Sequence, residues 1–137
     1  MNIKINESNG RLLDSAELSI HDDILVRLQY DRKTRELLLE MKSHQEKEYR
    51  IRFVYVMCFE MTSCDFWGES PFVLDMEYVE PESRTLLPRI FNIQKQYPDD
   101  FSTSPLNNGL PKLESKIMFS SGDFLIVACE SILFEEL

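Results

Sequence analysis

Carboxylates are the most chemically versatile side chains of this sequence, and two of them have a regular spacing. Asp75 and Glu77 lie two residues apart in a segment that alternates apolar and polar residues. Such alternation indicates a strand and places both carboxylates on one face, about 7 Å apart. A pair of this kind can hydrolyse a glycosidic bond by acid–base catalysis. Because the same spacing is common on solvent-facing sheets, the pair alone does not predict an enzyme.

His21 is followed by Asp22 and Asp23, so three residues of metal-binding types stand together. A metal site needs a further ligand from elsewhere in the chain, and the sequence nominates none. A polar turn at the start of a strand is the simpler interpretation of this trio. His44 lies in another polar turn, where we expect it to be solvated. We therefore predict no metal site and no cofactor.

The other residue types that carry chemistry lack a recognisable pattern. The cysteines, Cys58, Cys64 and Cys129, have no metal-binding spacing, and the first and last stand in apolar strands as small hydrophobic residues. The four glycines are isolated, so there is no phosphate-binding loop or dinucleotide fingerprint, and there is no GxSxG motif. We therefore predict that the protein is not an enzyme.

An aromatic pair in a loop is the most informative local feature. Phe66 and Trp67, the single tryptophan, precede Gly68 in a stretch that breaks the strand pattern. Two acidic residues, Asp65 and Glu69, flank them. In one interpretation Trp67 covers one end of the core. In the other it anchors a protein partner, because aromatic side chains dominate the binding energy of many protein interfaces.

The net charge of −9 at pH 7 is unevenly distributed over the 137 residues. Residues 1–53 hold ten basic and ten acidic side chains, whereas residues 54–137 hold five and fourteen, and residues 54–83 contain no lysine or arginine. A negative field repels phosphate and anionic lipids, so we expect neither nucleic acid nor a membrane as partner. It attracts a basic protein surface, although excess acid also serves solubility alone.

The dominant sequence period is two, which predicts a mostly β (α+β) fold. We expect an antiparallel β-sandwich or a strongly bent antiparallel sheet, formed by residues 1–137 as a single domain. One helix is predicted at about Leu86–Gln96, with Thr85 as its N-cap, and a shorter one at Ser15–Ser19, capped by Asp14. The predicted strands are 24–30, 37–41, 49–61, 72–79, 113–119, 124–129 and 131–134, the last as a strand or a tail.

The alternation also predicts which side chains share a face. The strand predicted at 49–61 is unusually long, so we expect it to bend or to contain a bulge. In two other strands we expect one apolar face each, opposite a more polar one. The residues expected on these apolar faces are Ile24, Val26, Leu28 and Tyr30 in the first, and Phe72, Leu74, Met76 and Tyr78 in the second.

Two features bear on location. The N-terminal residues lack the basic patch, apolar stretch and cleavage site of a secretory signal, which predicts a cytoplasmic protein. No apolar run is long enough to predict a membrane-spanning helix.

The arrangement from about His21 to Phe134 resembles the small cytoplasmic immunity proteins of bacterial polymorphic-toxin systems, in particular mostly-β families with a Phe-Trp motif. The matching elements are Phe66-Trp67-Gly68, Asp75-Met76-Glu77-Tyr78, the His21-Asp22-Asp23 opening and the hairpin Phe119-Ser120-Ser121-Gly122-Asp123-Phe124. The resemblance implies a protein that binds and neutralises a cognate toxin, often a nuclease with a basic active-site cleft. It implies no catalytic residues.

Charge and resemblance together predict a binding surface for a basic protein. The predicted partner-binding residues are Asp65, Phe66, Trp67, Glu69, Asp75, Glu77, Glu80 and Glu82. The oligomeric state, monomer or homodimer, stays open. The alternative is a β-sandwich module that binds a small apolar ligand or pairs with a second copy of itself, because aromatic residues and six methionines can line a pocket or a dimer face.

Overall fold

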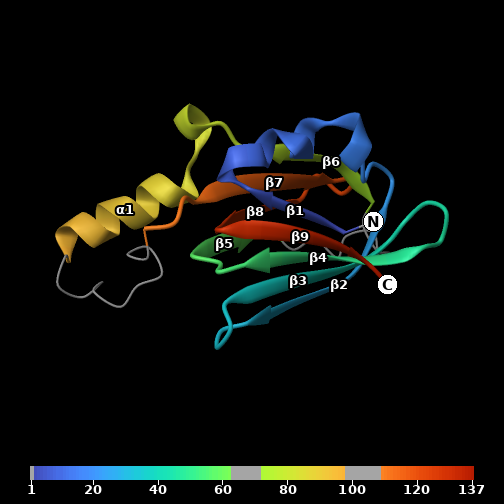
Figure 1. Ribbon diagram of the computed structural model, residues 1–137, viewed down its shortest axis with the longest axis horizontal. Coiled ribbons are helices and arrows are strands. Elements are labelled where there is room, and N and C mark those ends of the chain that lie inside the picture. The colour runs from blue at the N-terminus through green and yellow to red at the C-terminus, as the bar shows by residue number, and fades with distance from the viewer. Residues whose placement is uncertain (1, 63–71, 98–108) are drawn as a thin grey trace.

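The structure is a computed structural model that describes residues 2–62, 72–97 and 109–137. Two antiparallel sheets pack against each other (Figure 1), and the predicted mostly β, α+β fold class is confirmed. The five-stranded sheet has the order β1-β9-β4-β3-β2 and consists of β1 (Ile3–Asn6), β2 (Ile24–Asp31), β3 (Glu36–Lys42), β4 (Glu48–Val54) and β9 (Ser131–Glu136). The four-stranded sheet has the order β5-β8-β7-β6 and consists of β5 (Cys58–Met61), β6 (Val73–Tyr78), β7 (Leu113–Phe119) and β8 (Phe124–Cys129).

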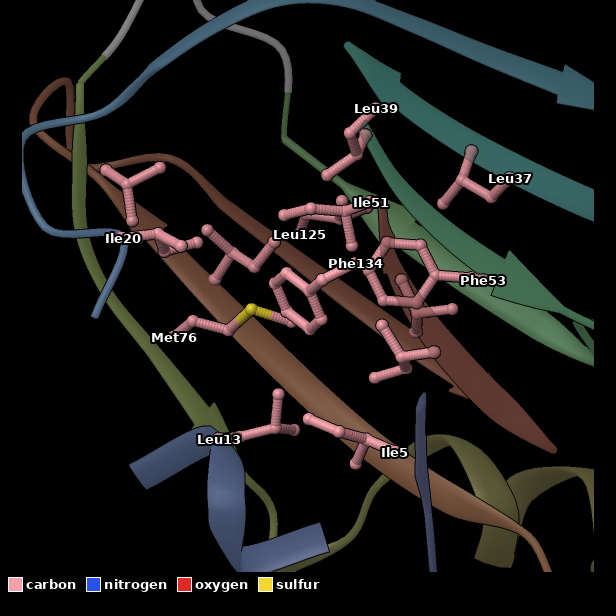
Figure 2. Close-up of a cluster of buried hydrophobic side chains, with 14 of the residues drawn as sticks. Ile5, Leu13, Ile20, Leu37, Leu39, Ile51, Phe53, Met76, Leu125 and Phe134 are labelled. Carbon is pink, nitrogen blue, oxygen red and sulfur yellow. The ribbon is translucent and has the colours of Figure 1, made fainter. Parts of the chain in front are cut away.

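Buried apolar side chains from both sheets fill the space between them (Figure 2). Ile51 and Phe53 of β4 and Leu125 of β8 are fully buried in one cluster, which also takes in Leu13 from the N-terminal segment. Burying a side chain of this size is worth about 1.5–3 kcal/mol relative to exposure. The cluster therefore joins the two sheets and the N-terminal segment into one packed unit.

The predicted strand 49–61 is two strands that belong to different sheets. β4 ends at Val54, and Tyr55 adopts a left-handed backbone conformation with a φ of 51°. The chain then enters the other sheet as β5. Its pairing partner changes sheet at the same level, because β4 pairs with β9, β5 pairs with β8, and Glu130 connects β8 to β9. Alternation cannot reveal this break because side chains on both sides of it are apolar.

Bulges in β2 and β6 overturn part of the predicted apolar faces. The pairing register shifts between Leu25 and Arg27, so that Leu25 is buried and Val26 is 57% exposed. In β6 the shift lies between Val73 and Asp75, and it buries Val73 while leaving Leu74 47% exposed. An extra residue in one strand reverses the alternation, because side chains point to opposite faces at every step.

Helix α1 (Leu86–Gln96) occurs at the predicted bounds with Thr85 at the predicted N-cap position, but another residue supplies the capping hydrogen bonds. The Thr85 side chain makes no capping hydrogen bond. Instead the Glu114 carboxylate, fully buried on β7, accepts the Thr85 N–H at 3.2 Å and the Leu87 N–H at 2.6 Å. Only Leu86 and Leu87 of the helix are buried, and the rest of α1 extends away from the sheets (Figure 1).

The N-terminal segment differs most from its prediction. β1 and the 3₁₀ helix η1 (Glu7–Asp14) were not predicted, and the expected helix at 15–19 is a single 3₁₀ turn, η2 (Ala16–Leu18). Asp14 does not cap η2, because its Oδ1 atom accepts the Tyr78 N–H from β6 at 3.1 Å. A third short 3₁₀ helix, η3 (Pro81–Ser83), follows β6.

Candidate functional site

The predicted partner-binding residues divide into two groups. Four of them, Asp65, Phe66, Trp67 and Glu69, lie outside the described residues. The other four lie on β6 or directly after it and are called the acidic edge from here on. The acidic edge consists of Asp75 and Glu77 within β6, Glu80 directly before η3, and Glu82 within η3.

Asp75 and Glu77 are both exposed, as the alternation predicts. β6 is an edge strand of its sheet, so these carboxylates stand at a border of the sheet. Glu77 lies opposite Lys116 of β7, but the Lys116 ammonium sits 5.4 Å from the Phe124 ring centroid. Among the described residues, no ion pair involves Asp75, Glu77 or Glu82, so these three carboxylates contribute charge to the surface.

Glu80 differs because its charge is neutralised. Both oxygens of the Glu80 carboxylate accept hydrogen bonds from the Arg11 guanidinium of η1, one of them at 2.8 Å. This bidentate contact raises the pKa of Arg11 above its ordinary value. Glu80 therefore ties η1 to the end of β6 and adds little to the negative field.

A hydrogen-bonded cluster behind the acidic edge holds β6 against η1. The Tyr78 hydroxyl donates to Glu7 Oε1 at 2.7 Å, and Arg84 donates to Glu7 Oε2 at 2.8 Å. Burial is the main cause that raises the pKa of Tyr78, followed by its hydrogen bond to Glu7. A Cβ atom on Gly10 would lie 2.6 Å from the Tyr78 ring, so only glycine allows η1 to approach this closely. These contacts therefore hold β6, which carries Asp75 and Glu77, in place against η1.

A surface cavity of about 290 Å³ lies between η1–η2 and β6. Part of its apolar lining comes from the core residues Leu13, Leu18, Ile20 and Met76, which are 4–9% exposed, and the exposed Ala16 and Leu74 supply the rest. Polar groups complete the lining, among them the exposed Asp14 and Asp75. The cavity therefore joins the acidic edge to a carboxylate that the sequence did not nominate, since only the packing of η1 on β6 brings Asp14 there.

The outer face of the five-stranded sheet has a different electrostatic character. Arg27, Glu40, Arg50 and Glu135 stand opposite one another in this order across β2, β3, β4 and β9. Arg52 lies 3.5 Å from Glu36 and 3.3 Å from Glu135. Opposite charges on adjacent strands cancel at this distance. This face is self-neutralised and does not share in the excess of acid.

The trio at 21–23 anchors strands. The His21 Nδ1–H donates to the Leu74 carbonyl at 2.6 Å, and Asp23, which is 4% exposed, accepts the Tyr49 hydroxyl at 2.5 Å. Asp23 also accepts the His44 N–H at 3.2 Å, so it pins the turn between β3 and β4. Burial and this carboxylate raise the pKa of Tyr49. Within the described residues, no three His, Cys, Asp or Glu side chains are grouped to hold a metal.

The comparisons with known proteins add no identity to this geometry. No family model, curated protein or solved structure matches the chain. Within the described part of the chain, no helix combines the length and the apolar character needed to cross a bilayer. The fold and site therefore define the protein only as a mostly β domain with a fixed acidic edge beside a surface cavity.

Proposed function

We propose that this chain is a non-catalytic cytoplasmic binding protein that presents its acidic edge to a cationic protein. The observation that carries the proposal is that Asp75 and Glu77 on β6, and Glu82 on η3, are exposed without an ion-pair partner among the described residues. Some other acidic side chains are matched with basic ones, such as Glu60 with Arg89 at 2.5 Å. Charge left unmatched on a rigid strand is available to a partner.

The resemblance to immunity proteins specifies the partner as a toxin domain with a basic active-site cleft. Carboxylates on the acidic edge would occupy the place of the substrate's phosphates in such a cleft. Electrostatic attraction between the two surfaces gives fast, salt-sensitive association. The interaction inhibits by occlusion, so it requires no catalytic group from this chain.

Co-expression with the product of the neighbouring gene tests this function. We expect the chain to rescue growth of cells that express the neighbouring product and to co-purify with it. The variant D75K/E77K is expected to lose both effects. E46K/E48K changes the net charge by the same amount, but Glu48 lies in β4 of the other sheet and Glu46 in the turn before β4. This variant is expected to retain both the rescue and the co-purification. Failure of the wild-type chain to rescue or co-purify, or equal behaviour of the two variants, would contradict the proposal.

Self-association is the second candidate, and exposed apolar side chains on α1 favour it. Phe91 and Ile93 are 42% and 43% exposed on the distal part of the helix, and Tyr97, directly after it, is 56% exposed. A small apolar ligand is less well supported, because two further cavities, of about 260 and 380 Å³, are lined largely by polar and charged residues. Sedimentation velocity of the wild type and of F91S/I93S separates these cases: a dimer that the substitutions dissociate supports self-association, and a wild-type monomer rejects it.

A further inference from the structure

The cavity between η1–η2 and β6 is lined by apolar side chains, by carboxylates and by backbone groups of β6, and these suit one type of side chain. Buried apolar residues, Leu13, Ile20 and Met76 among them, supply contact surface for an aliphatic stem. Asp14 and Asp75 supply carboxylates from two segments that are 61 positions apart in the chain. His21 and two serines complete the lining, and a ligand with an apolar stem that ends in a cation matches the apolar residues and the two carboxylates.

The backbone of β6 adds a hydrogen-bonding group to the same cavity. The Val79 N–H donates to Glu114 O of β7, whereas the Tyr78 N–H donates to Asp14 on the opposite side. Backbone groups alternate between the two edges of a strand, so those of Met76 point to the same side as those of Tyr78. Leu74 O on this edge accepts from His21, and Met76 lines the cavity between these two contacts.

We propose that this cavity is a receptor for an arginine side chain of the cationic partner. The stem packs on Leu13, Ile20 and Met76, and the guanidinium donates to the Asp14 and Asp75 carboxylates and to the Met76 carbonyl. Guanidinium offers five N–H donors in a planar fork, so it can satisfy acceptors on several sides of one cavity. Lysine has a compact, strongly hydrated head, so its affinity is lower here.

Asp14 and Asp75 are held in place differently, which makes them separable by mutation. Asp14 is fixed because its Oδ1 atom accepts the Tyr78 N–H. D14N keeps an oxygen for that bond and removes only the charge, so β6 stays in place. D75N is likewise a change of charge with little change of shape, at an exposed position. Glu48 is exposed on the other sheet and belongs neither to the acidic edge nor to the cavity lining, so E48Q is the matched control.

Titration of the ¹⁵N-labelled protein with N-acetyl-arginine amide tests the site by NMR. We expect saturable shifts of the amides at 14–20 and 74–76, with a dissociation constant in the millimolar range, about −4 kcal/mol. N-acetyl-citrulline amide has the same shape without the charge and is expected to bind at least tenfold more weakly. D14N and D75N are expected to weaken arginine binding at least threefold, and E48Q to leave it unchanged. Equal shifts with arginine and citrulline, or shifts elsewhere on the protein, would overturn the proposal.

The arginine site rests on the proposed function, but the two fail separately. If the co-expressed partner binds through the acidic edge while the arginine probe does not enter the cavity, the arginine site is refuted and the proposed function stands. If the probe binds in the cavity and no cationic protein is recruited, the site stands and the proposed function is refuted.

Discussion

The Glu114 carboxylate is expected to be a major contributor to the stability of this fold, although it is a charged group in a sheet. It is fully buried and accepts the N–H groups of Thr85 and Leu87 at the start of α1. A carboxylate at this position satisfies donors that a helix leaves unpaired and interacts favourably with the helix dipole. The perturbation of interest is E114A, with E114Q as the milder companion.

The magnitude follows from the two hydrogen bonds. A hydrogen bond to a charged group contributes about 1.5–3 kcal/mol. Thr85 is exposed, so water replaces part of its bond in E114A, whereas Leu87 is 3% exposed and its N–H stays without an acceptor. We therefore expect E114A to lower the free energy of unfolding by about 2–4 kcal/mol. E114Q keeps one acceptor oxygen and is expected to cost about half of that.

Urea unfolding monitored by circular dichroism measures both values, and hydrogen exchange at the Leu87 amide reports the local effect. E48A removes an exposed carboxylate of the same length and is expected to stay within about 0.5 kcal/mol of the wild type. If E114A is no less stable than E48A, the buried carboxylate does not cap the helix.

Two further perturbations test the support of the acidic edge and the Asp23 anchor. G10A places a methyl group 2.6 Å from the Tyr78 ring, so we expect the free energy of unfolding, measured with urea, to fall by about 1–3 kcal/mol. An unchanged free energy of unfolding would contradict the close approach of η1 to β6. Burial raises the pKa of Tyr49, so the folded protein keeps the Tyr49 proton while the unfolded chain loses it above pH of about 10. Stability should therefore decline above that pH by up to about 1.4 kcal/mol per pH unit, and Y49F, less stable at neutral pH, should decline less steeply. Parallel declines for the wild type and Y49F would contradict a partly buried Tyr49 that keeps its proton.

The elements that sequence alone located are those whose pattern is local. The strands of the β2–β3 hairpin and of the β7–β8 hairpin were predicted because period two persists on both sides of a polar turn. Helix α1 was predicted because the helical spacing of its apolar residues is also a local signal. These signals depend on a few neighbouring residues, so they need no knowledge of the packing.

The features that were missed depend on contacts between distant segments. β1 is a short edge strand whose sequence becomes a strand by pairing with β9 at the other end of the chain. The bulges in β2 and β6 follow from the pairing register, which alternation within one strand does not contain. Alternation along 113–119 does not reveal the burial of Glu114, because only the position of α1 makes its carboxylate a buried cap.

The candidate site shows the same division. The exposure of Asp75 and Glu77 was predicted from their spacing, because the alternation of side chains is a property of a single strand. Neutralisation of Glu80 by Arg11 joins positions 69 residues apart, so the sequence overstated the charge available at that position. Asp14 was interpreted as a helix cap, and its place beside the cavity follows from the packing of η1 on β6.

The association rate of the co-expressed partner, measured over a range of salt concentrations, tests most directly whether the acidic edge recruits a cationic protein. We predict that D75K/E77K lowers this rate roughly tenfold at low salt and flattens its salt dependence, while E46K/E48K changes both only slightly. Identical rates and salt dependence for the two variants would show that the interface lies elsewhere on the protein.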